Sequence, residues 1–76
     1  MNQEKFIKLI KSIGFLSDDK SNAYYYKDFR INLFSNNYDL CVGNYILYAR
    51  EFKELDILDE YFKKELRAIK LKELLK

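Results

Sequence analysis

The first stretch of the chain alternates apolar and polar residues with the period of an α-helix. The apolar side chains recur three or four positions apart, so they fall on one side of a helix, and lysines occupy the other side. These apolar positions are Phe6, Ile7, Leu9, Ile10 and Ile13. Gly14 follows and suits a helix C-cap. We expect a helix over residues 3–13 that packs on a sheet; an amphipathic helix lying on a membrane is the alternative.

The middle of the chain changes to the two-residue period of β-strands. After a polar loop over residues 16–22, residues 23–49 predict an antiparallel β-meander. The strands are expected at about 23–27, 29–35, 38–42 and 45–49. Asn36-Asn37 and Gly43-Asn44 are plausible two-residue turns. Lys27-Asp28 is either a tight turn or a bulge inside one long strand, so the sheet has three or four strands.

The last third of the chain, residues 52–75, returns to helical spacing but carries two apolar stripes. The first stripe consists of Leu55, Leu58, Phe62, Leu66 and Ile69. The second consists of Ile57, Tyr61, Ala68, Leu71 and Leu75. A lone surface helix needs one stripe, so the second indicates a kink near Arg67, burial on two sides, or contact with another chain. On the last alternative, the second interface comprises Ile57, Tyr61, Leu71 and Leu75.

These elements predict one small α+β domain spanning residues 1–76. The order is an N-terminal helix, a three- or four-stranded antiparallel meander and a long C-terminal helix. Both helices would cover the same face of the sheet and give two layers. Seventy-six residues bury only a modest core. The aromatic content of 17% supplies much of the area that such a core can bury.

Charge is polarised along the C-terminal helix. Residues 51–60 hold five acids and one base, whereas residues 63–76 hold six bases and two acids. Acidic residues first and basic residues last complement the helix dipole, which explains the pattern without a ligand. A basic tail that contacts phosphates is the sharper alternative.

The stretch NAYYYKDF places three tyrosines in a row, and successive side chains of a strand point to opposite faces. If the first strand runs into the second without a turn, Tyr25 faces the core, and Tyr24 and Tyr26 face outward. A hairpin at Lys27-Asp28 would reverse this assignment. In the fourth strand, either Tyr45 and Leu47 or Ile46 and Tyr48 face outward. The resulting candidate partner-binding residues are Tyr24, Tyr26, Arg30, Asn32, Phe34 and Tyr48.

An uncovered face rich in aromatic residues and arginine has several interpretations. It is typical of the residues that dominate protein interfaces, and also of platforms that stack single-stranded nucleic acid. Exposed tyrosines that only stabilise cross-strand pairs are a third reading. The net charge of +2, and the net charge of −1 over residues 14–49, make nucleic acid the weaker alternative.

The sequence offers little catalytic chemistry. It contains no histidine, two glycines and one cysteine, Cys41, which we place outward and half-buried in the third strand. The acid pairs Asp18/Asp19 and Asp59/Glu60 lack partners in a rigid arrangement. We therefore expect no enzyme, no metal and no cofactor. A lone cysteine and the lack of any long apolar run favour a cytoplasmic protein without membrane contact.

In size and in its richness in Lys, Ile, Asn and Tyr, the chain resembles small accessory proteins of bacteriophages and mobile elements from AT-rich bacteria. Some of those, such as anti-CRISPR and other anti-defence proteins, bind and block a host protein. The resemblance rests on no motif and transfers no residue. It favours a protein-binding module that inhibits a larger host protein. A single-stranded nucleic-acid binder and a structural homodimer are the alternatives.

Overall fold

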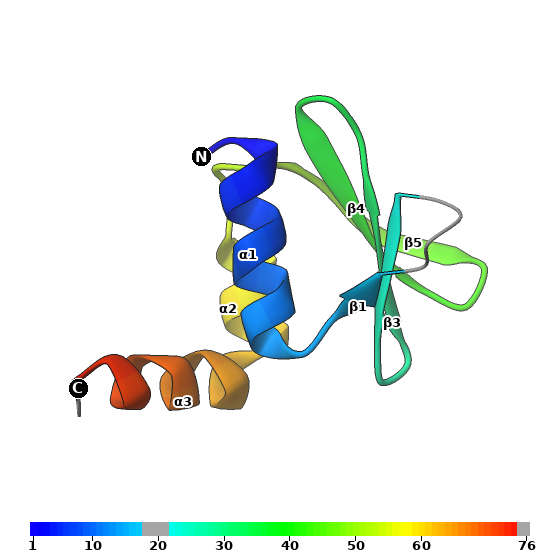
Figure 1. Cartoon of the computed structure of the whole chain (residues 1–76). Helices are drawn as coiled ribbons and strands as arrows, with labels where there is room; N and C mark the ends of the chain where they lie inside the picture. Colours follow the sequence, from blue (N-terminus) through cyan, green and yellow to red (C-terminus); the bar gives the residue numbers. More distant parts are fainter. Residues whose placement is uncertain (18–21, 75–76) are drawn as a thin grey trace.

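The computed structural model describes residues 1–17 and 22–74, and shows an α+β fold with a five-stranded sheet (Figure 1). In chain order the elements are α1 (Gln3–Ile13), β1 (Leu16–Ser17), β2 (Ala23–Tyr26), β3 (Phe29–Leu33), β4 (Asn37–Val42), β5 (Tyr45–Glu51), α2 (Asp56–Tyr61) and α3 (Lys63–Leu74). All neighbouring strands are antiparallel, in the sheet order β1-β2-β3-β4-β5. The predicted order of helix, antiparallel meander and C-terminal helical segment is confirmed.

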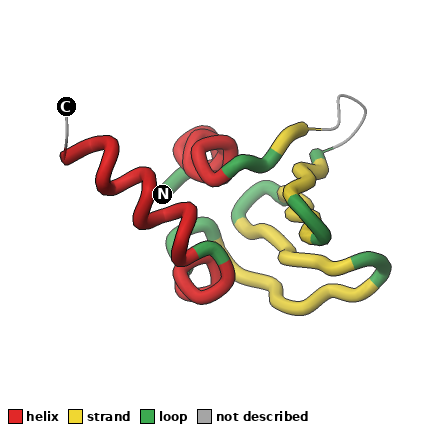
Figure 2. Tube along the Cα trace, turned by 90° about the horizontal axis from the view of Figure 1, so that it is seen from below, coloured by secondary structure: helices red, strands yellow, loops and turns green. Residues whose placement is uncertain are grey.

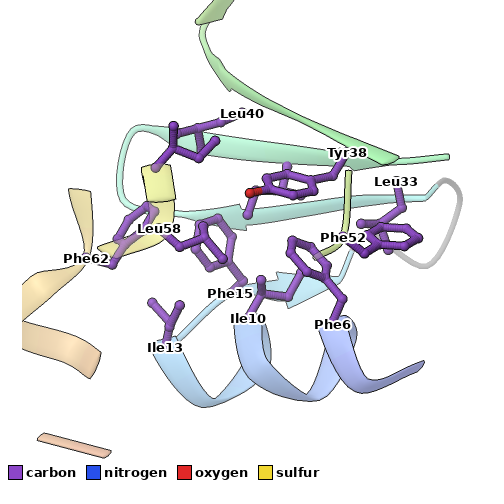
Figure 3. Packing of buried hydrophobic residues seen from close by; sticks show 12 residues of the cluster. Phe6, Ile10, Ile13, Phe15, Leu33, Tyr38, Leu40, Phe52, Leu58 and Phe62 are labelled. Carbon is purple, nitrogen blue, oxygen red and sulfur yellow. The ribbon is translucent and has the colours of Figure 1, made fainter. Parts of the chain in front are cut away.

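The helices and the sheet form two layers, as expected. Figure 2 shows α1 and α2 side by side against one side of the sheet, with α3 crossing beside them and leading away from it. The facing side chains form one apolar cluster, in which Phe6 and Ile10 of α1 point toward Tyr38 and Leu40 of β4 (Figure 3). This cluster is rich in rings: the centroids of Phe6 and Tyr38 are 4.4 Å apart. Aromatic burial therefore supplies much of the core, as the composition indicated.

Helix α1 has the predicted bounds, and both of its ends are capped. The Asn2 side chain accepts a hydrogen bond from the backbone N–H of Lys5 at 2.9 Å, which satisfies an otherwise unpaired donor. At the other end Gly14 adopts a φ of 134° and its N–H donates to the Ile10 carbonyl. The chain then reverses into Phe15, whose ring is buried. The caps therefore fix the helix between a polar start and a glycine stop.

The Lys27-Asp28 pair is a two-residue hairpin turn and not a bulge. Tyr26 pairs with Phe29 across it, and Lys27 takes a positive φ of 53°. The hairpin reverses the facing of the tyrosines from the outward assignment of Tyr24 and Tyr26. Both are half-buried and pack against the core, because their cross-strand partners Ile31 and Phe29 face the helices. Tyr25 is the ring on the outer face.

The sheet has five strands, where three or four were expected. Leu16 and Ser17, assigned to a polar loop, form the short edge strand β1 and pair with Tyr25 and Tyr24. The loop residues Asp18 and Asp19 lie outside the described residues. β5 also continues to Glu51, two positions beyond its expected end, and β4 begins at Asn37, which was assigned to a turn.

The C-terminal segment is two helices separated at Phe62, rather than one helix over residues 52–75. Phe62 leaves the helical conformation with φ −122° and ψ 35° and is almost fully buried. Its ring meets Phe15 edge-on at 5.3 Å and Phe29 at 5.1 Å. The first stripe packs on the core on both sides of the break, through Leu58, Phe62, Leu66 and Ile69. In the second stripe Ile57 is buried, whereas Tyr61, Ala68 and Leu71 are exposed, so the break does not bury that stripe. A kink near Arg67 was one of the three alternatives for this segment; the break lies five residues earlier, at Phe62.

Candidate protein-binding surface

The outer face of the sheet, away from the helices, carries one row of residues that crosses all five strands. The register aligns Leu16, Tyr25, Arg30, Cys41 and Ile46, which we call the outer row. At about 4.8 Å between strands, the row spans roughly 19 Å. Its ends are apolar and exposed, with Leu16 at 74%, Tyr25 at 45% and Ile46 at 62% of their full accessibility. The row thus places exposed apolar groups on both sides of an arginine.

The β4–β5 hairpin concentrates exposed apolar side chains at its turn. Leu40 pairs with Tyr48, but Cys41 pairs with Ile46, so Leu47 is an extra residue that forms a bulge. A bulge re-aims side chains and breaks the strict alternation of faces. As a result Tyr45, Ile46 and Leu47 are all exposed, at 76%, 62% and 41%. We call these three residues the hairpin tip; Ile46 joins the tip to the outer row.

The centre of the outer face is more polar and more closely packed. Arg30 and Asn32 lie there as predicted, and both are half-buried. Cys41 is fully buried instead of half-buried, and the Asn32 side-chain amide donates to its sulfur at 3.6 Å. The thiol is therefore shielded on this face, with Arg30 and Asn32 beside it.

The outer edge of β5 is partly closed to strand addition. An unpaired edge strand can recruit a strand from another chain, and proteins commonly block this. The N–H of Glu51 donates to the Glu54 carboxylate at 3.2 Å, and the Glu51 carbonyl accepts from the Glu54 N–H at 3.0 Å. The Arg50 guanidinium covers the Ala49 carbonyl at 2.9 Å. Backbone pairing with a partner is therefore disfavoured at this end, and side-chain contact at the tip is the more accessible mode.

Two residues predicted for interfaces instead dock α2 on the sheet. Tyr48 lies on the helix-facing side of β5, and its ring centroid is 6.0 Å from that of Tyr61. A hydrogen bond with Tyr48 raises the pKa of the Tyr61 hydroxyl. Tyr61 also meets Phe29 edge-on at 5.7 Å. The prediction that Tyr48 lies on the outer face of the sheet is therefore wrong. Only part of the Tyr61 ring remains accessible to a partner.

The remaining predicted interface residues are scattered. Phe34 is exposed but follows β3 in a turn at the opposite end of the sheet from the hairpin tip, where its N–H donates to the Asn37 carbonyl at 2.8 Å. Ile57 is buried in the core, which removes it from any interface. Leu71 is exposed on α3, and Leu75 lies outside the described residues. The structure therefore does not gather the second predicted interface into one surface.

Leu16 was assigned to a loop, and Tyr45, Ile46 and Leu47 were only alternatives for the outer face, so none of them was among the candidate binding residues. Strict alternation along a strand turns adjacent side chains to opposite faces, so it cannot expose all three residues of the tip. The available signal was the run of five apolar residues at positions 45–49, directly after a Gly-Asn turn. A run of consecutive apolar residues on a surface is an error in a design unless it is functional.

No group of three or more His, Cys, Asp or Glu side chains that could hold a metal occurs in residues 1–17 and 22–74. None of the helices described is both long and apolar enough to cross a membrane. Comparisons with protein-family models, with curated proteins and with solved structures each gave no match to this chain.

Proposed function

We propose that this protein is a small non-enzymatic binding module that docks on a larger protein through its hairpin tip and outer row. The observation that carries the proposal is the exposure of three consecutive apolar side chains at Tyr45, Ile46 and Leu47. Exposed apolar groups of this kind, bordered by polar residues, mark protein interaction sites. Arg30 in the adjoining row adds the residue type that, with tyrosine, dominates interface energetics.

The tip has the energetic means to anchor a complex. Full burial of one large apolar side chain stabilises a complex by about 1.5–3 kcal/mol. Because the strands already hold the backbone of the hairpin, binding costs mainly the rotamer freedom of the three side chains. A few such anchors commonly account for most of the affinity of an interface.

The partner we propose is a host protein, and the outcome of binding is inhibition. This part rests on the resemblance in size and composition to phage and mobile-element accessory proteins of the anti-defence type. We propose a cytoplasmic location, because the lone cysteine fits a reducing compartment. A homodimer is the second candidate, because the same apolar tip on two copies would be self-complementary. The single-stranded nucleic-acid alternative loses support, since Tyr24 and Tyr26 lie on the helix-facing side of the sheet.

Site-specific photo-crosslinking in producing cells tests the proposal. A photoreactive residue at Ile46 should give one discrete adduct, whereas the same residue at Leu71, which is similarly exposed at 59%, should not. The variant Leu47→Ser with the crosslinker at Ile46 should weaken the adduct. An adduct of twice the chain mass would support the homodimer instead. Equal labelling at both positions, or none at Ile46, would refute a specific interface at the tip.

A further inference from the structure

Helix α3 carries the largest net positive charge of the described elements. Between Lys63 and Leu74 it carries five bases against two acids. The basic residues are Lys63, Lys64, Arg67, Lys70 and Lys72, and all five are exposed. An exposed cluster of one sign raises the local concentration of oppositely charged partners. The dipole of α3 explains bases in its last turn, but it does not explain Lys63 and Lys64 at its start.

The bases of α3 are not neutralised by ion pairs with the rest of the described chain. Glu65, one of the two acids of α3, is paired with Lys27 of the hairpin at 3.7 Å and is mostly buried. The other ion pairs among the described side chains join Arg50 to Asp56 and Lys53 to Glu51. Within that set no α3 base forms an ion pair, and Asp59 is the acid that lines the same hollow as three of these bases.

The bases are arranged along the helix in a regular way. Lys63, Arg67 and Lys70 share one side of α3 and line a shallow hollow together with Leu66 and Asp59. Seven residues of helix rise about 10 Å, which is close to the rise of three base pairs of duplex DNA. Lys64 and Lys72 lie further round the helix, so positive charge flanks it on more than one side.

The position of α3 makes this charge accessible. Leu66 and Ile69 anchor its inner side on the core, and Phe62 fixes its start. Beyond these contacts the helix runs away from the sheet, with its C-terminal end at the periphery of the molecule (Figure 1). A helix of this diameter fits the major groove of a duplex, where phosphates line both sides.

We infer that α3 binds the phosphate backbone of a duplex nucleic acid, without reading its sequence. A duplex fits better than a single strand, because no exposed ring lines the described hollow, and the neighbouring Tyr61 is engaged by Phe29 and Tyr48. The net negative charge of residues 14–49 does not oppose this, since it belongs to the sheet and its loops. The inference is independent of the protein-binding function proposed above and uses a different surface.

Fluorescence anisotropy with a short labelled DNA duplex tests the inference. Three phosphate contacts give a slope of about −2.7 in a plot of log affinity against log salt, so that a fourfold rise in salt weakens binding about 40-fold. The triple variant K63Q/R67Q/K70Q should abolish binding. The control K5Q/K8Q/K11Q removes the same charge from α1 and should bind nearly as well as the parent.

Substitution of Asp59 provides a second test, in which the expected result is tighter binding of the duplex and not a loss of binding. Its carboxylate lies in the same hollow as the three bases and repels phosphate. Asp59→Asn should therefore bind the duplex several-fold more tightly. Circular dichroism of each variant establishes that the helices are retained.

Three outcomes would overturn the inference. The first is no binding to the duplex at low salt by the parent chain. The second is equal weakening of duplex binding by the α3 and α1 triple variants, which would show that binding depends only on the net charge of the protein. The third is stronger binding of polyglutamate than of the duplex, which would assign α3 to an acidic polypeptide.

Discussion

The ring of Tyr26 lies against Gly14, so closely that there is no room for a side chain on that glycine. A Cβ placed on Gly14 would come 2.7 Å from Cε1 and 2.9 Å from Cδ1 of Tyr26. The same ring is 5.4 Å from Phe15 and 6.0 Å from Phe62, measured between centroids. The end of α1, the β2–β3 hairpin and the α2–α3 break therefore meet at one point.

Gly14→Ala should destabilise the protein strongly. Alanine at a φ of 134° is strained, and its Cβ would displace a ring that is packed between other rings. We expect the free energy of unfolding to fall by about 2–4 kcal/mol, a large part of the total for a domain of this size. Urea denaturation followed by circular dichroism measures the change.

Gly43→Ala is the matched control for this prediction. Gly43 also has a positive φ, of 58°, but among the described atoms nothing lies within 4 Å of a Cβ placed on it. The free energy of unfolding of the Gly43→Ala variant should fall by only about 1 kcal/mol, from backbone strain alone. Equal losses at the two glycines would show that the contact with Tyr26 contributes nothing.

Two adjacent tyrosines should respond differently to truncation. Tyr26→Ala removes a ring packed on Phe15 and Phe62 and should cost about 2–4 kcal/mol of stability. Tyr25→Ala removes a ring exposed on the outer row and should cost less than about 1 kcal/mol. Thermal or urea unfolding of both variants gives the comparison. A larger loss of stability for Tyr25→Ala than for Tyr26→Ala would show that Tyr26, and not Tyr25, faces outward.

Alkaline pH should destabilise the fold through Tyr38. Burial, reinforced by the charge of Asp56, raises the pKa of its phenol well above the ordinary value of 10.0, and the hydroxyl donates to the Glu54 carbonyl at 2.6 Å. The folded state therefore favours the neutral phenol. This contribution is complete below pH 10.0 and is lost as the pH rises above it toward the pKa of the folded state.

The pH dependence of unfolding measures this effect. The free energy of unfolding should fall above about pH 10 in the parent chain and fall less steeply in Tyr38→Phe. That variant should also lose about 1–3 kcal/mol at neutral pH, since the Glu54 carbonyl loses its donor. Tyr25→Phe is the control, because its phenol is exposed. A parallel pH profile for Tyr38→Phe and the parent would contradict the assignment.

Phe62→Ala should destabilise the packing of the helices against the sheet. The side chain closes the space between Phe15 and Phe29, so its removal leaves a cavity and should cost about 3–5 kcal/mol. Leu71→Ala, on the exposed side of α3, should change stability by less than about 0.5 kcal/mol. Chemical denaturation of the two variants distinguishes an anchored α3 from one that is loosely attached.

The fold class could be predicted from the periodicity of the apolar residues. The details that were predicted wrongly are those that tertiary packing decides. Helix α1 was predicted to the residue, because a single apolar stripe and a glycine stop agree; the Asn2 cap that fixes its start was found only in the structure. The break at Phe62 was missed, since no glycine or proline marks it and only the burial of its ring requires it. The facing of Tyr24 and Tyr26 depended on one turn, where Lys27 adopts a positive φ that its residue type does not signal.

The candidate surface was less predictable than the fold for a related reason. Arg30 and Asn32 were correctly placed on the outer face by alternation along β3. The hairpin tip depends on a bulge, and a bulge shifts the facing of every later residue in its strand. Leu16 joined the surface only because a two-residue strand formed where the sequence reads as a loop.

The break at Phe62 also bears on the order in which a newly made chain can fold. Each strand pairs with its neighbour in sequence, so the sheet can assemble hairpin by hairpin as it emerges from the ribosome. The rings of Phe15 and Phe29 then remain uncovered until Phe62 has been synthesised. During that interval the nascent chain exposes its apolar core, and chaperone binding should be greatest just before residue 62 leaves the exit tunnel.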